Sequence, residues 1–169
     1  MFATFQEVFA TFNQFVTPFR YAPEGSRIYP FIGEKTIRAL FEDTDKGETV
    51  ALLALAAAYL NQSEFERMVG ETLAKDRIGL QGGHAVAGTS LGKALAEGGL
   101  LGLMGLEPPP VRSGGVGWQF DAKRDTEPMV AAVRLGRRYA ACLTRTLMRE
   151  QMKLESAEEK ARLARFSVK

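Results

Sequence analysis

A seven-residue repeat at the start of the chain constrains the fold more than any other feature of the sequence. The letters FATF occur at residues 2–5 and again at residues 9–12. Alternating steps of three and four place the large apolar residues of this segment within about 100° of arc on an α-helix. The stripe consists of Phe2, Phe5, Phe9, Phe12, Val16 and Phe19. The spacing therefore predicts an amphipathic helix over residues 2–17, since Pro18 disfavours helical backbone in the residue before it.

This apolar face is too large to be left in water. Burying one Phe contributes roughly 1.5–3 kcal/mol, so five of them contribute roughly 8–15 kcal/mol, which is comparable with the net stability of a small domain, about 5–15 kcal/mol. Glu7 is the single charge in the first nineteen residues. We expect residues 1–20 to form a docking arm that another protein subunit covers.

Three kinds of surface could cover the stripe. The chain's own later helices could bury it, as they do for most amphipathic helices. A homo- or hetero-oligomeric partner could receive it in a groove, because such helices are bound through residues at i, i+3, i+4 and i+7. Membrane contact is disfavoured, because membrane-surface helices carry Lys and Arg on the polar face, where this segment has Thr, Gln, Asn and Glu.

Residues 21–169 are expected to form a single helical domain. At 169 residues the chain can bury one core, and its apolar content of 46% and charged content of 25% are ordinary for a globular protein. Further helices are predicted near residues 34–43, 48–61, 63–73, 91–97 and 126–154, with a capping box at Ser156 that restarts the last one. We predict a mainly α, compact bundle of about six helices with little or no sheet.

The segment from 79 to 105 holds nine glycines in 27 residues. Each glycine costs a helix about 1 kcal/mol relative to alanine, so the pattern favours close backbone packing, with a flexible element as the alternative. Ser90 is predicted to be the N-cap of the helix over 91–97. A loop with a small hairpin over 116–120 is expected to follow.

The last quarter of the chain is basic. Residues 1–129 carry 12 Lys and Arg against 16 Asp and Glu, a net charge of −4, whereas residues 130–169 carry 10 against 4, a net charge of +6. Helical spacing gathers most of these cations on one side of the last helix. The candidate binding residues are Arg134, Arg137, Arg138, Arg145, Arg149 and Lys153.

Arginine suits bidentate contact with phosphate or carboxylate. This stripe therefore predicts contact with a nucleic-acid backbone or an acidic partner, and a solvated helix face is the bland alternative. No aromatic residue is interleaved with the arginines, so base stacking is not expected.

The sequence contains no complete catalytic set. GTSLG at residues 88–92 matches the nucleophile-elbow pattern with Ser90 at its centre, but that motif needs a preceding strand and a later histidine. The one histidine, His84, lies before the serine. We expect a protein that is not an enzyme, with a serine hydrolase acting through Ser90 as the alternative.

Cofactors, metals and secretion are not indicated by the sequence. With one cysteine, Cys142, and one histidine the chain cannot supply a His/Cys metal cluster or an internal disulfide. No signal peptide or membrane span is predicted, so we expect a reducing, cytoplasmic compartment. The leading hypothesis is a helical subunit or adaptor of a larger assembly, and the alternative is an accessory protein that binds a nucleic-acid backbone without sequence specificity.

Overall fold

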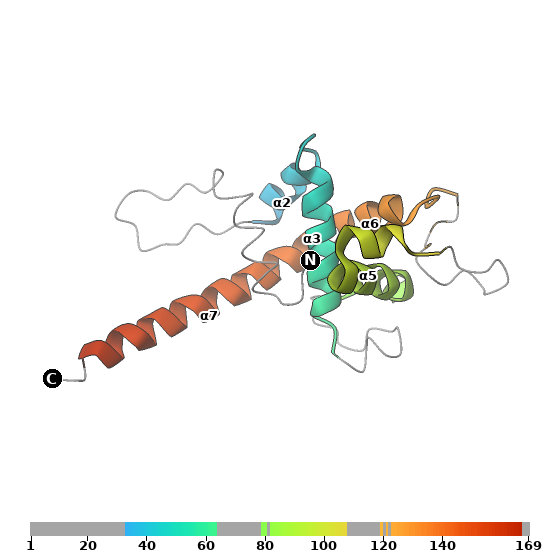
Figure 1. Ribbon diagram of the computed structural model, residues 1–169. Helices are drawn as coiled ribbons and strands as arrows, with labels where there is room; N and C mark the ends of the chain where they lie inside the picture. The colour runs from blue at the N-terminus through green and yellow to red at the C-terminus, as the bar shows by residue number, and fades with distance from the viewer. Residues whose placement is uncertain are drawn as a thin grey trace.

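Five α-helices and two 3₁₀ turns make up the described part of the chain, where no residue lies in a β-strand (Figure 1). The computed structural model describes residues 33–63, 79–80, 82–107, 119, 121 and 123–166. The elements are α2 (Glu34–Phe41), α3 (Gly47–Leu60), η2 (Gly82–His84), α5 (Ala85–Met104), α6 (Pro128–Gly136), η3 (Arg137–Tyr139) and α7 (Ala140–Phe166). The predicted helical class is confirmed, whereas the Phe-rich helix and the helix expected from Ser63 lie outside the described residues.

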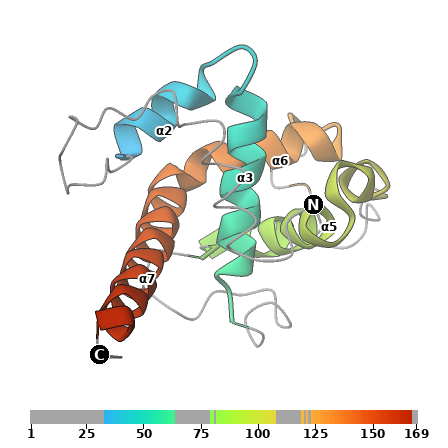
Figure 2. The same cartoon turned by 60° about the vertical axis from the view of Figure 1, so that its left-hand side comes forward.

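Helix α3 is the centre of the core. Every residue from Val50 to Tyr59 is buried, with at most 7% of its surface exposed. Helices α2, α5, α6 and α7 all pack against it, as Figure 2 shows. A helix that is covered on every side must be apolar all round, and the run VALLALAAAYL meets this requirement. The predicted helix over 48–61 is therefore confirmed.

Helix α2 covers one side of α3 through three apolar residues at helical spacing. Ile37, Leu40 and Phe41 are buried, and the helix predicted near residues 34–43 is confirmed. The acidic turn that follows is stabilised locally, since the Asp43 carboxylate accepts hydrogen bonds from the backbone N–H groups of Asp45 (3.0 Å) and Lys46 (2.9 Å). This turn brings α3 back across α2.

The glycine-rich segment forms helix α5, and its glycines allow close packing. A side-chain carbon at Gly92 would lie 2.5 Å from Cβ of Tyr59 on α3, so α3 and α5 approach more closely than alanine would permit. Helix α5 is kinked at Gly99, whose φ of 60° suits glycine. The prediction that Ser90 caps a helix is wrong, because α5 begins at Ala85 and contains Ser90 in its second turn.

The last predicted helix is two helices. A 3₁₀ turn over Arg137–Tyr139 separates α6 from α7, at the point where a side-chain carbon on Gly136 would collide with the backbone carbonyl of Ala51. At this close approach α6 packs against α3, and after η3 the chain continues as α7 in a different direction (Figure 1). The capping box at Ser156 is also a wrong prediction, because α7 continues through it to Phe166.

Candidate interaction surfaces

The predicted docking surface at the start of the chain precedes the described residues. Its side chains belong to residues 2–19, and the description begins at residue 33. The Phe stripe therefore stays a prediction. The described candidates are the basic residues of α6, η3 and α7, a groove between α3 and α6, and the end of α5.

Arg134 differs from the other predicted basic residues because two carboxylates hold its guanidinium. Its Nε donates a 2.9 Å hydrogen bond to Oδ1 of Asp125, and its Nη2 contacts the same oxygen. Its Nη1 lies 3.1 Å from Oδ2 of Asp121. The Arg134 side chain is 24% exposed and that of Asp125 is fully buried. This guanidinium fixes the loop over 121–125 to α6, and is not presented to a ligand.

The two aspartates that contact Arg134 are also hydrogen-bonded to each other. The backbone N–H of Asp121 donates to Oδ2 of Asp125 over 2.7 Å, and the backbone N–H of Asp125 donates to the carbonyl of Asp121 over 2.8 Å. Partial burial raises the pKa of the Asp121 carboxyl. The hydrogen bond from the backbone N–H of Lys123 and the nearby Arg134 guanidinium lower this pKa by more than burial raises it. The net effect is a pKa below the usual value, so Asp121 stays ionised as a partner for Arg134.

The remaining predicted basic residues are exposed. They are Arg137, Arg138, Arg145, Arg149 and Lys153. A 3₁₀ turn advances about 120° per residue, against 100° in an α-helix, so η3 changes the helical phase that aligned Arg134 with the later cations. Arg145, Arg149 and Lys153 keep four-residue spacing within α7, and we call these three residues the basic row.

Helix α7 extends well beyond the body of the molecule. From Ala140 to Leu147 every residue except Ala141 and Arg145 is buried, whereas every described side chain from Met148 to Lys160 is exposed. Figures 1 and 2 show the helix projecting to one side of the other helices. The stretch from Met148 to Phe166 is about 28 Å long at 1.5 Å per residue. We call it the α7 arm.

His84 lies at the start of α5, close enough to η3 for Arg138 to affect it. Burial lowers the pKa of the His84 imidazole, and the positive charge of Arg138 lowers it further. Both effects disfavour the protonated ring. His84 is therefore predominantly neutral at pH 7.

The described residues do not assemble the serine site that GTSLG would require. Ser90 lies inside helix α5, away from any strand-to-helix elbow. Within the described ranges, no group of three or more His, Cys, Asp or Glu side chains is placed to hold a metal ion. Cys142 is buried in the core.

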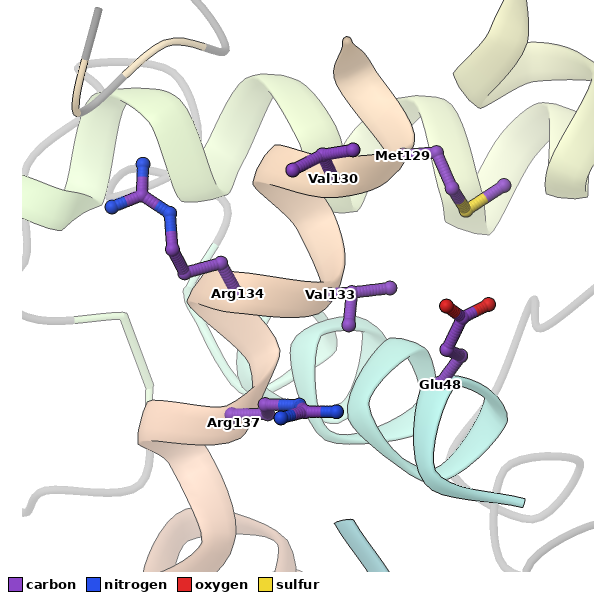
Figure 3. A pocket seen from close by; sticks show the side chains of 6 residues that line it. All are labelled: Glu48, Met129, Val130, Val133, Arg134 and Arg137. Carbon is purple, nitrogen blue, oxygen red and sulfur yellow. The ribbon is translucent and has the colours of Figure 1, made fainter. Parts of the chain in front are cut away.

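A groove of about 290 Å³ lies between α6 and the start of α3. We call it the α6 groove, and it is lined by Glu48, Met129, Val130, Val133, Arg134 and Arg137. Figure 3 shows the Arg137 side chain extending towards α3, whereas Arg134 points the other way. The groove therefore has an apolar floor of Met129, Val130 and Val133, with charged groups at its edges.

The end of α5 exposes a second apolar surface, which the sequence analysis missed. Leu100, Leu101 and Met104 are 53%, 80% and 69% exposed, and we call them the α5 knob. Their neighbour Leu103 is fully buried. Helical spacing could not reveal this surface, because the kink at Gly99 interrupts the helical phase between Leu95 and Leu103. The prediction of close backbone packing for this segment does not include an exposed apolar surface.

Comparisons with known proteins add no relative. The chain matches no protein-family model, no curated protein sequence and no solved structure at a significant level. None of the helices within the described ranges combines the length and the apolar character that a membrane span requires. The surfaces above must therefore be interpreted from their own chemistry.

Proposed function

We propose that this chain is a non-enzymatic helical subunit or adaptor of a larger assembly, and that it docks through the Phe stripe of residues 2–19. The observation that carries the proposal is the α7 arm. Helices in proteins gain most of their stability from packing an apolar face against other elements, yet all nine described side chains of the arm are exposed. An arm of this length supports a role in contact with other molecules.

Exposed apolar side chains support the same proposal. Met148 and Met152, one turn apart on the arm, are 38% and 65% exposed, and the α5 knob adds three more. Methionine side chains adapt to irregular partner surfaces and are common at binding sites for varied targets. Contiguous exposed apolar groups of this kind mark interaction sites more often than single scattered ones do.

Paired substitutions in the stripe test the docking proposal. In the full chain, Phe5→Ser with Phe12→Ser should reduce the particle mass measured by sedimentation and leave the thermal midpoint of the body unchanged. Thr4→Ser with Thr11→Ser, on the polar face of the same predicted helix, is the matched control and should change neither. A large fall in the thermal midpoint would show that the stripe belongs to the chain's own core, and would overturn the proposal.

The basic row supports a second candidate function, the binding of a nucleic-acid backbone. Arg145, Arg149 and Lys153 are exposed along α7 at intervals of about 6 Å, and phosphates recur along each strand of a nucleic acid at a similar spacing. Backbone contacts of this kind give affinity without sequence information. The absence of aromatic side chains among these three residues disfavours base stacking as a contribution.

A salt titration tests this second candidate. The affinity of the full chain for a 20-nucleotide single strand should fall with salt, with a logarithmic slope of about 0.7 for each phosphate engaged. Arg145→Glu with Arg149→Glu should abolish the binding, and Arg124→Glu, a reversal outside α7, should leave it intact. Equal binding by both variants would show that the basic row is a solvated helix face that does not contact the nucleic acid, and would contradict this second candidate function.

A further inference from the structure

We propose that a second copy of this chain is one of its partners, with the α5 knob of one copy seated in the α6 groove of the other. This inference rests on the proposed function, because it names a partner for an assembly subunit. It uses described surfaces that are separate from the Phe stripe, so it can fail independently. The argument depends on the shape of the knob, the floor of the groove and the order of charges on the two helices.

The knob is built to point away from its own body. Gly99 breaks the regular course of α5 with a φ of 60°, and the last turn follows this kink. Leu103 anchors that turn in the core, while Leu101 on the same turn is 80% exposed. Three large apolar side chains are thus held together on a single anchored turn, which limits the conformational entropy that a partner must restrict on binding.

The α6 groove offers an apolar floor of the right scale. Val130, at the outer edge of the floor, is 44% exposed. The volume of about 290 Å³ lies just below the range of small-molecule pockets, about 300–1,000 Å³. A groove of this size accommodates one or two side chains of leucine or methionine, and the knob supplies both types.

The charges on the two helices occur in complementary order. Along α5 the exposed Glu97 precedes the knob, and along α6 the exposed Arg137 follows the floor residues Val130 and Val133. If the two helices cross in antiparallel directions, the apolar parts meet and Glu97 approaches Arg137. Both side chains remain near solvent at the rim, where charge pairs contribute more to the choice of partner than to affinity.

Arg137 can change partners at little cost. Its present contact is with Glu42, at 3.8 Å between Nη1 and Oε1, and the two side chains are 43% and 79% exposed. Exposed pairs of this length contribute little to stability. A carboxylate brought in beside an apolar surface would compete well with Glu42.

The knob cannot fill the groove of its own molecule. Helices α5 and α6 pack against each other within one body, which fixes the distance between the two surfaces. Leu101 is highly exposed in this arrangement, so it does not occupy the groove beside it. A second copy, which presents the same knob on an independent body, meets no such restriction.

Sedimentation velocity of the full chain over a range of concentrations tests the inference. Leu101→Asp in the knob and Val130→Asp in the groove should each weaken self-association at least tenfold. Val86→Asp, at an apolar residue near the start of α5 that is 37% exposed and belongs to neither surface, is the control and should have no effect. Circular dichroism melting of each variant verifies that the body stays folded.

A charge-reversal cycle decides whether these two surfaces meet. Glu97→Arg and Arg137→Glu should each weaken self-association, and the chain carrying both changes should regain it, because the pair is restored with its signs exchanged. Failure of the double variant to recover, or a chain that never self-associates, would overturn the inference.

The Phe5→Ser and Phe12→Ser variant separates the two proposals. If only this stripe variant lowers the particle mass, the second-copy contact is wrong and the docking proposal stands. If only the knob and groove variants lower the particle mass, the docking proposal is wrong and the second-copy contact stands.

Discussion

Asp125 shows how much of this fold depends on one side chain in a loop. Its carboxylate is fully buried, and it accepts hydrogen bonds from Arg134 on α6 and from the backbone N–H of Asp121. A buried carboxylate is stable only when it is paired and hydrogen-bonded. The loop before α6 and the helix itself are therefore coupled through Arg134, which forms ion pairs with Asp125 and with Asp121.

Removal of the cation from this pair should be costly. Arg134→Leu removes the guanidinium that forms an ion pair with the buried Asp125 carboxylate, and breaking a buried pair by removing one member typically destabilises by about 3–5 kcal/mol. The comparison is Arg124→Leu, because the Arg124 side chain is 75% exposed and lies 3.8 Å from Asp121, and exposed pairs contribute about 0–1 kcal/mol. Urea unfolding measures both free energies. Equal losses in the two variants would contradict the role given to Asp125.

His84 should make the stability depend on pH in a defined direction. Its pKa in the folded protein is below the usual value of about 6.5 because of burial and Arg138. The unfolded chain therefore binds the proton more readily, so the stability is full above pH 7 and falls as the pH drops through 6.5 towards the folded pKa. His84→Gln should remove this loss. The chain has one histidine, so NMR can follow its titration directly, and Arg138→Gln should move the measured pKa upwards.

At the scale of the elements, glycine decides how closely the helices approach α3. Gly136 sits where a side-chain carbon would overlap the backbone carbonyl of Ala51, whereas nothing lies within 4 Å of the corresponding point at Gly98. A flexible side chain could move aside, but a buried backbone carbonyl in the central helix cannot. The close packing of α6 against α3 therefore requires glycine at residue 136.

Two alanine substitutions test this requirement. Gly136→Ala should destabilise by about 2–3 kcal/mol or more, as overpacking of a core does. Gly98→Ala should be neutral or stabilise by about 0.5–1 kcal/mol, since alanine favours helix. Thermal unfolding of the two variants measures the contrast. A Gly136→Ala chain as stable as the parent would mean that α6 and α3 are further apart than described.

Elements formed by interactions between residues close in the sequence could be predicted, whereas features that depend on residues far apart in the sequence could not. Periodic apolar residues, namely Ile37, Leu40 and Phe41, predicted α2. The continuous apolar run from Val50 to Leu60 predicted α3. The break at η3 depends on a contact between Gly136 and Ala51, which are 85 residues apart, so local patterns could not reveal it. The ion pair of Arg134 with Asp125 spans a loop and a helix, and for this reason Arg134 was grouped with the exposed cations.

Local motifs also misled where the surrounding helix was stronger. Ser90 and Ser156 match capping patterns, yet both lie inside helices, because a cap motif has no effect when residues on both sides already continue the helix. Exposure of the α5 knob was missed for a different reason. Apolar residues in a glycine-rich run resemble packing, and only the burial of Leu103 beside them shows which face is turned inwards.

At the scale of the whole molecule, the protein combines a buried centre with surfaces that its own described helices do not cover. Helix α3 is enclosed by four neighbours, while the α7 arm, the α5 knob and the α6 groove lie open. The chain is also polarised, with its positive charge concentrated after residue 130. These features together support an assembly subunit, in which one folded body carries several contact surfaces.

The mass of the particle that carries this chain under native conditions tests the central claim most directly. Size-exclusion chromatography with light scattering, applied to gently purified full-length protein from the cells that make it, gives that mass. We predict a value at least twice the chain mass of 18.6 kDa, and a lower value once Phe5 and Phe12 are replaced by serine. A particle of 18.6 kDa at every concentration, unchanged by those substitutions, would contradict the account.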